Sequence, residues 1–228
     1  TFYIPTANHY YDNFGNKDDV NAYVKASQQF GKLNLFADLQ YRMVFYQANS
    51  TKFEDINDTF RFFNPKVGLN YQFNSKNAFY GFAGIANKEP RRDDYENGAN
   101  KPERLFDFEG GWKFNSNKFR INANAFYMLY QDQLVLTGAL NDVGSPIFTN
   151  SGESYRLGLE IEAVAKITNW FTIQANGTLS QNKNKDFYFE RDGVLANLGN
   201  TNIAYSPNMV IGNALTYSPI KMFQISLL

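Results

Sequence analysis

The stretch RRDDY, from Arg91 to Tyr95, carries the densest set of binding groups in the sequence. Each guanidinium offers paired donors that match an anionic group, and an aromatic ring beside it offers a stacking surface. Arg91, Arg92 and Tyr95 are therefore candidate residues for holding an anionic or catechol-bearing ligand. The alternative is a charge cluster that only meets solvent, and the residues alone leave both interpretations open.

Residue types for metal binding and nucleophilic catalysis are scarce. The chain has no cysteine and one histidine, His9, with no second ligand at metal-binding spacing. Asp93 to Gly98 looks like a calcium loop, but Tyr95 occupies its third position and Arg104 the place of the bidentate glutamate. There is no G-x-S-x-G motif. We predict no metal site, no cofactor and no catalytic residue, and hence a protein that is not an enzyme.

Charge argues against nucleic acid as a partner. Lysine plus arginine and aspartate plus glutamate each number 22, so the formal net charge is zero, whereas nucleic-acid binding needs a basic surface. Aromatic residues make up 17% of the chain. They are mixed with polar residues, and no run reaches the roughly 18 apolar residues of a spanning helix.

The elements that would position these groups are predicted to be β-strands. Apolar and polar residues alternate along nearly the whole chain, while helical spacing never persists. We predict about ten strands. They lie near Asp18–Gln29, Lys32–Gln47, Arg61–Phe73, Ala78–Ala86, Arg104–Phe114, Lys118–Leu136, Tyr155–Lys166, Asn169–Gln181, Asn208–Tyr217 and Lys221–Leu228.

Short turns and long polar connections alternate between these strands. The long connections are Ala48–Thr59, Asn87–Glu103, Thr137–Ser154 and Asn182–Pro207. In an up-and-down sheet, alternate connections lie at opposite ends, so one end should carry only short turns. This asymmetry is typical of an outer-membrane β-barrel with short periplasmic turns and long extracellular loops. Rings beside the short turns, such as Phe119 and Trp170, fit an aromatic girdle at the membrane boundary.

The alternation also predicts which side chains face lipid. Odd positions from Phe119 to Leu129 are apolar, while the even positions begin with Arg120, Asn122 and Asn124. In a transmembrane barrel the apolar side meets lipid and the polar side a wet lumen, where carboxylates stay solvated. The residues predicted to face the lumen are Glu109, Arg120, Asn122, Asn124, Arg156, Glu160 and Glu162.

The long loops would bring further candidates to the extracellular mouth that carries RRDDY. These weaker candidates for contact with a ligand are Tyr10, Tyr11, Gln131 and Asp132.

Five runs of sequence, taken in order, resemble the barrel of TonB-dependent outer-membrane receptors. They are NPKVGLNYQF (Asn64–Phe73), ANKEPRRDDY (Ala86–Tyr95), KPERLFDFEGGWKF (Lys101–Phe114), YQDQLVLTG (Tyr130–Gly138) and SYRLGLEIEA (Ser154–Ala163). The likeness extends from about Asn64 to Tyr217.

The resemblance implies an antiparallel barrel of about twenty-two strands around a plug in the outer membrane of a Gram-negative bacterium. It implies import of a scarce, bulky nutrient such as an iron chelate or cobalamin, powered by the inner-membrane TonB complex. Residues 1–228 would then be a run of about ten strands from the second half of the barrel, with the plug, the TonB-contacting segment and the closing strand outside the chain. The RRDDY arginines could instead pair with plug carboxylates. The alternative function is a passive porin, or an adhesin whose long loops bind a surface partner.

Overall fold

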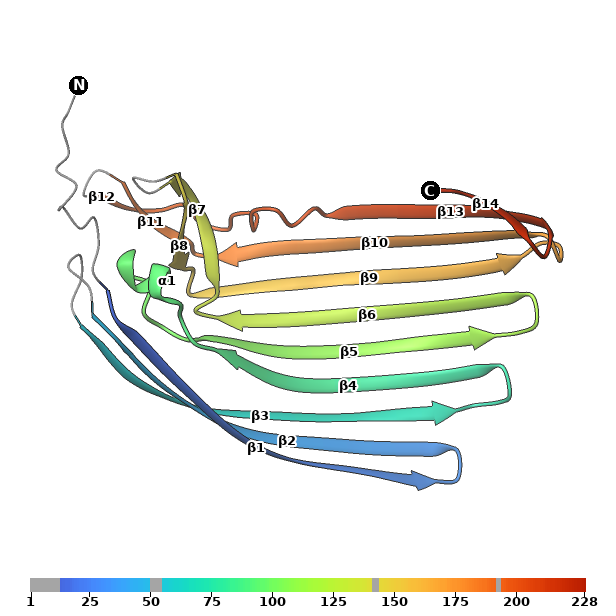
Figure 1. The fold of residues 1–228 in the computed structure, drawn as a ribbon, viewed down its shortest axis with the longest axis horizontal. Helices are drawn as coiled ribbons and strands as arrows, with labels where there is room; N and C mark the ends of the chain where they lie inside the picture. The colour runs from blue at the N-terminus through green and yellow to red at the C-terminus, as the bar shows by residue number, and fades with distance from the viewer. Residues whose placement is uncertain (1–12, 50–54, 141–143, 192–193) are drawn as a thin grey trace.

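The computed structural model describes residues 13–49, 55–140, 144–191 and 194–228. Most of these residues form one antiparallel sheet of ten strands in the spatial order β1-β2-β3-β4-β5-β6-β9-β10-β13-β14 (Figure 1). Its strands are β1 (Gly15–Phe30), β2 (Leu33–Ala48), β3 (Ile56–Gln72), β4 (Asn77–Lys88), β5 (Glu103–Asn115), β6 (Phe119–Gln131), β9 (Glu153–Lys166), β10 (Phe171–Lys185), β13 (Met209–Ile220) and β14 (Phe223–Leu227). The predicted all-β, up-and-down architecture is confirmed.

The remaining elements lie in the long connections, at one end of the sheet. A short helix, α1 (Arg92–Glu96), joins β4 to β5. One hairpin, β7 (Leu134–Leu140) with β8 (Pro146–Asn150), lies between β6 and β9, and a second, β11 (Tyr188–Arg191) with β12 (Val194–Asn197), lies between β10 and β13. The short turns all lie at the opposite end (Figure 1), as the alternating lengths predicted.

No helix in the part of the chain that the structure describes is long and apolar enough to cross a membrane.

Turn chemistry explains the short connections. Gly31 between β1 and β2 has a φ of +56°, a left-handed conformation that glycine adopts without steric cost. Between β3 and β4, the Asn74 side-chain oxygen accepts hydrogen bonds from the backbone N–H groups of Lys76 and Asn77, at 2.9 and 3.0 Å. Such side-chain caps fix a turn locally, so each hairpin closes within a few residues.

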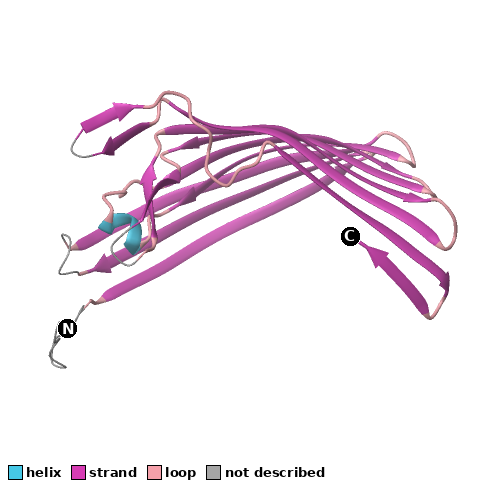
Figure 2. Ribbon diagram, turned by 90° about the horizontal axis from the view of Figure 1, so that it is seen from above, coloured by secondary structure: helices cyan, strands magenta, loops and turns pink. Residues whose placement is uncertain are grey.

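Cross-strand pairing sorts the side chains onto two faces. Directly paired residues of antiparallel strands point to the same side of the sheet. Asn122 on β6 pairs with Glu162 on β9, whereas Ala123 pairs with Trp112 on β5 and Ile161 on β9. We call the side that carries Asn122 the polar face and the side that carries Ala123 the apolar face. The sheet between them is curved (Figure 2).

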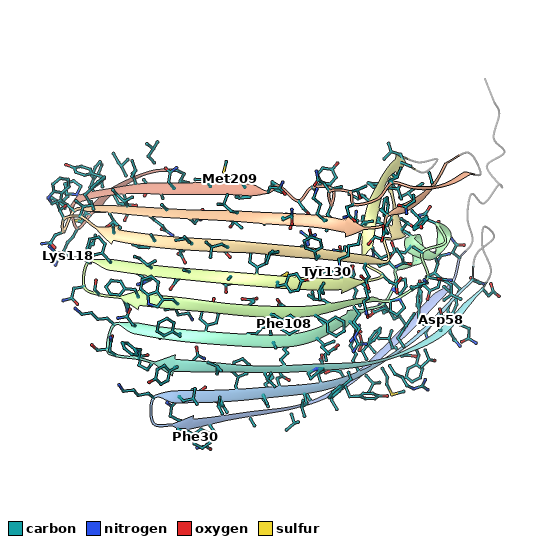
Figure 3. The ribbon with its side chains drawn as sticks, turned by 180° about the vertical axis from the view of Figure 1, so that it is seen from behind. Phe30, Asp58, Phe108, Lys118, Tyr130 and Met209 are labelled. Atoms are coloured by element: carbon teal, nitrogen blue, oxygen red, sulfur yellow. The ribbon has the colours of Figure 1, made fainter. Side chains whose placement is uncertain are left out.

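The apolar face is open to its surroundings. Phe108, Leu159 and Ile161 keep 47%, 45% and 44% of their surface exposed, and Phe108 stands in the middle of the wall (Figure 3). A contiguous apolar surface of this size is unusual on a water-soluble monomer and is the surface that a lipid-facing barrel wall presents. Near the short turns, the ring centroids of Trp170 and Tyr217 lie 5.4 Å apart.

The predicted strand Lys118–Leu136 is too long. The structure ends it at Gln131, as β6, because Asp132 adopts a left-handed φ of +51°, a conformation that aspartate tolerates better than most residues. The Asn150 side-chain amide donates to the Asp132 carbonyl at 2.8 Å and holds the break. The residues after it belong to the β7–β8 hairpin, which the alternation alone could not separate from β6.

Candidate functional site

The RRDDY stretch begins α1 and stabilises that helix from within. Arg91 is the residue before the helix, and its backbone N–H donates to Asp94 Oδ2 at 2.7 Å. The Arg91 guanidinium lies 3.5 Å from the same carboxylate, which is 1% exposed. The Arg91 side chain is itself 58% exposed, so this arginine keeps most of its donor surface.

Arg92 connects the helix to Asn49, just after β2. Its Nη2 donates to the Asn49 carbonyl at 2.9 Å, and its Nε lies 3.3 Å from Glu96 Oε1. The two arginines of the stretch therefore differ, because Arg92 makes contacts that hold the loop together while Arg91 stays largely accessible.

Tyr95 attaches α1 to the wall. Its hydroxyl donates to Asp58 on β3, and its ring centroid lies 6.0 Å from that of Tyr46 on β2. Burial, and then the hydrogen bond to Asp58, raise the pKa of the Tyr95 hydroxyl well above its usual range, so the group stays protonated. Asp58 pairs with Tyr46 across β2 and β3. Asp58 lies at the long-loop end (Figure 3).

A second attachment, at Glu89, was not anticipated from the sequence. Glu89 Oε1 lies 2.5 Å from Lys17 Nζ on β1, and both of its oxygens bond to the Arg42 guanidinium on β2, at 2.8 and 3.0 Å. Arg42 also binds Asp19 on β1, at 2.6 Å for the closest pair of atoms. These groups lie on the polar face of β1 and β2, because the register aligns Lys17 with Tyr46, Asn21 with Arg42, and Tyr46 in turn with Asp58.

The other side of the same loop contacts the β7–β8 hairpin. The Arg91 guanidinium carbon lies 5.3 Å from the ring centroid of Phe148 on β8, within the range of a cation–π interaction. The Lys101 backbone and the Asn150 side chain exchange two hydrogen bonds, at 3.3 and 3.1 Å. The β4–β5 loop therefore runs from the polar face of β1–β3 to the hairpin on the far side of α1 (Figure 1).

The weaker ligand candidates are divided by the structure. Asp132 lies near this loop, with Oδ1 3.6 Å from Lys101 Nζ. Gln131 pairs with Arg104 and Glu153, which places it on the apolar face. Tyr10 and Tyr11, like His9, lie outside the described residues.

The residues predicted to face the lumen all share the polar face. Asn124 Nδ2 donates to Glu109 Oε2 at 3.0 Å, and Asn122 Nδ2 donates to Glu162 Oε2 at 3.2 Å. The others occupy the same side by register: Arg120, Arg156 and Glu160. Cross-strand amide–carboxylate bonds of this kind satisfy polar groups along the wall.

The end of the loop before β13, from Ala204 to Pro207, covers part of this polar face. Arg156 Nη1 donates to Ser206 Oγ at 3.0 Å, and Ser180 Oγ donates to the Pro207 carbonyl at 3.3 Å. Tyr205, just before Ser206, has a left-handed φ of +52° and is 93% exposed. A cavity of about 450 Å³ lies between this loop segment and the wall, where it is lined by Glu109, Asn124, Met128 and Glu160 among others. The sequence predicted a long loop that ends at Pro207, but gave no signal that its last residues contact the polar face.

A family model described as "TonB dependent receptor-like, beta-barrel" matches residues 1–224. No curated protein matches the chain.

Many solved structures share the fold at low sequence identity, among them two receptors and one iron transporter of bacteria. The siderophore receptor PiuA from Acinetobacter baumannii aligns with a TM-score of 0.74 at 17% identity, over 92% of this chain and 32% of its own. The FrpB iron transporter from Neisseria meningitidis gives 0.65 at 20% identity, over 92% and 32%. The ferric-catecholate import receptor Fiu from E. coli K12 gives 0.66 at 14%, over 92% and 33%. The chain thus spans about a third of the length of each of them.

Proposed function

Because the chain belongs to the TonB-dependent receptor β-barrel family, and is therefore part of an outer-membrane receptor wall, we propose that the complete protein imports a scarce, bulky nutrient with energy supplied through TonB. The nutrient class is an iron chelate or cobalamin. The family is one of receptors and transporters rather than of enzymes. The partners in this proposal are outer-membrane lipid at the apolar face, the receptor's own plug at the polar face, and the inner-membrane TonB complex.

The observation that carries the proposal is the placement of Arg91. The β4–β5 loop lies over the polar face at the long-loop end, and Arg91 stands on it with an exposed guanidinium beside Phe148. A guanidinium next to a ring suits an anionic chelate with aromatic arms, through paired hydrogen bonds and stacking. Among the structural neighbours, Fiu is described as a ferric-catecholate receptor, and a ferric catecholate is accordingly the first probe for this chain.

Transport is tested in cells that produce the complete receptor. We expect cells to accumulate radioactive iron supplied as the ferric complex of dihydroxybenzoate, and to lose this accumulation when TonB is deleted. Ferric hydroxamate and cobalamin serve as parallel probes of the nutrient class. Uptake that survives the deletion and rises in proportion to concentration indicates the passive-pore alternative, and no uptake of any of the three contradicts import.

Arg91→Gln tests the contact itself. In the purified complete receptor, we expect this change to weaken binding of ferric dihydroxybenzoate by about 1.5 to 3 kcal/mol, the range for a lost charge-assisted hydrogen bond. Equilibrium titration at equal folded fraction measures it. Arg92→Gln is the comparison for the second arginine, whose side chain is 26% exposed, and we expect it to act on loop structure as well as on binding.

Lys101→Gln is the matched control for Arg91→Gln. Lys101 is a cation of the same loop, 65% exposed at its side chain and paired only at 3.6 Å with Asp132, and we expect its loss to leave affinity nearly unchanged. Equal losses of affinity for Arg91→Gln and Lys101→Gln would mean that binding depends on the net positive charge of the loop and not on a specific contact of Arg91. No loss for Arg91→Gln would leave this arginine as a helix-capping residue.

A further inference from the structure

Glu89 is the most heavily paired acidic residue among the described ion pairs, although it lies in a connection and not in a strand. Its side chain is 6% exposed. Both oxygens are used, by Lys17 on β1 and by the Arg42 guanidinium on β2. Burying a carboxylate is costly unless it is paired and hydrogen-bonded, so this loop position is committed to contact with the wall.

The partners of Glu89 are distant in the sequence. Lys17 lies 72 residues away and Arg42 lies 47 residues away. The contact therefore does not shape the loop locally. It fixes where the whole β4–β5 loop lies relative to β1 and β2, and Asp19 holds the Arg42 guanidinium from its other side, at 2.6 to 3.2 Å.

The helix that follows depends on this placement. α1 has five residues, and a helix shorter than roughly 12 residues does not persist alone in water. The helix is also attached by the Tyr95 hydroxyl and ring, to Asp58 and Tyr46 on the wall, and by Arg92, to the Asn49 carbonyl just after β2. Arg91, at the start of α1, is oriented by the helix that these contacts hold.

We propose that Glu89 is a positioning residue that docks the β4–β5 loop on the polar face of β1 and β2, so that Arg91 is presented in its binding orientation before any ligand arrives. This inference rests on the proposed role of Arg91 in ligand capture. Glu89 itself touches no ligand in this proposal. It acts by reducing the ordering cost that a free loop would incur on binding.

The docking is tested by hydrogen exchange on the complete receptor. The amides of Tyr95, Gly98 and Ala99 are protected by hydrogen bonds to Arg91, Tyr95 and Asp94 carbonyls, and they report whether α1 persists. We expect Glu89→Gln to accelerate their exchange by about tenfold or more, since it leaves Lys17 and Arg42 without their shared anion. Amides of β5 and β6 in the same sample report whether the wall is intact.

Two matched variants separate docking from general damage. Asp19→Asn removes the other carboxylate from Arg42 without changing the loop, and Glu96→Gln removes a loop carboxylate that bonds to Arg92 and not, among the described ion pairs, to the wall. We expect both to leave exchange in residues 95–99 within about threefold of the unmodified protein. Unchanged exchange in Glu89→Gln, or equal acceleration in all three variants, overturns the docking role.

Ligand presentation is then measured with ferric dihydroxybenzoate as the probe. We expect Glu89→Gln to weaken binding, and to have little further effect when Arg91→Gln is already present, because both changes act through the same guanidinium. If Arg91→Gln weakens binding but Glu89→Gln does not, pre-positioning is wrong. If Arg91→Gln has no effect on binding, the proposed ligand contact fails, and the exchange result alone decides whether Glu89 docks the loop.

Discussion

Two buried carboxylates of the β4–β5 loop have different tasks. Asp94, 1% exposed, is held by Arg91 three residues before it, so it stabilises the loop's own shape. Glu89 is held by side chains of β1 and β2, so it fixes the loop's position. A substitution at Asp94 should therefore alter α1, whereas one at Glu89 should release an otherwise complete loop.

The pH dependence of the dock follows from Glu89. Burial alone would raise the pKa of its carboxyl, but hydrogen bonds from Arg42 and Lys17 outweigh burial and lower the pKa from 4.5 to about 2. The charged groups around Glu89 are Lys17 and Arg42, together with Asp19, which bonds to Arg42. A lowered pKa means that this stabilisation is complete above about pH 4.5 and is lost as pH falls toward 2.

Hydrogen exchange of residues 95–99, corrected for the intrinsic effect of pH, checks this expectation. Protection should stay constant from pH 7 to about 5 and decline below about 4.5. The decline should be smaller in Glu89→Gln, in which only the other carboxylates that hold α1 remain. A decline that begins near neutral pH would assign the effect to some other group.

At the level of the strand, β6 offers a direct test of sidedness. Ala123 lies on the apolar face, and its neighbours Asn122 and Asn124 bond to Glu162 and Glu109 on the polar face. Ala123→Arg should cost about 2 to 4 kcal/mol if its face meets lipid near the bilayer midplane. Asn122→Arg and Asn124→Arg should cost less. Unfolding titrations in lipid vesicles measure all three, and equal costs would contradict the prediction of a lipid face and a lumen face.

Sequence periodicity predicted the strands and the alternating loop lengths well, but it did not predict the structure within the long loops. Alternation depends on residues next to one another, so β2, β5 and β9 were placed within a few residues of their observed ends. The break at Asp132 depends on one left-handed residue and on Asn150 further along the chain. Periodicity carries no signal for such a contact.

The same limit applies to the candidate site. RRDDY stood out because its groups are consecutive, and the structure keeps them together on α1. Glu89 did not stand out, because Lys17 and Arg42 reach it only after β1, β2 and β4 have paired through β3. Its role is a product of the sheet's topology rather than of any local pattern.

On the scale of the whole molecule, the described sheet is open, with β1 and β14 as its two edges. An unpaired edge exposes backbone donors and acceptors, and the apolar face adds exposed rings such as Phe108. We expect residues 1–228 alone, in buffer without detergent, to show no sharp cooperative thermal transition and to associate through these surfaces. Circular dichroism melts with light scattering measure both. A single sharp transition of a monomer would contradict this expectation.

The confinement of the long connections to one end has an evolutionary consequence. Doubling the length of a flexible connection costs only about 0.6 kcal/mol of closure entropy. The β7–β8 and β11–β12 hairpins, which belong to sheets of their own, could therefore lengthen, shorten or be exchanged between lineages with little effect on the pairing of the ten-stranded wall. The β4–β5 connection is constrained differently, since an insertion between Glu89 and Tyr95 would separate two anchors that fit the wall at a set spacing. Variation among relatives should then accumulate in the β11–β12 hairpin and in the part of the β7–β8 hairpin away from Phe148 and Asn150, and spare the anchored loop.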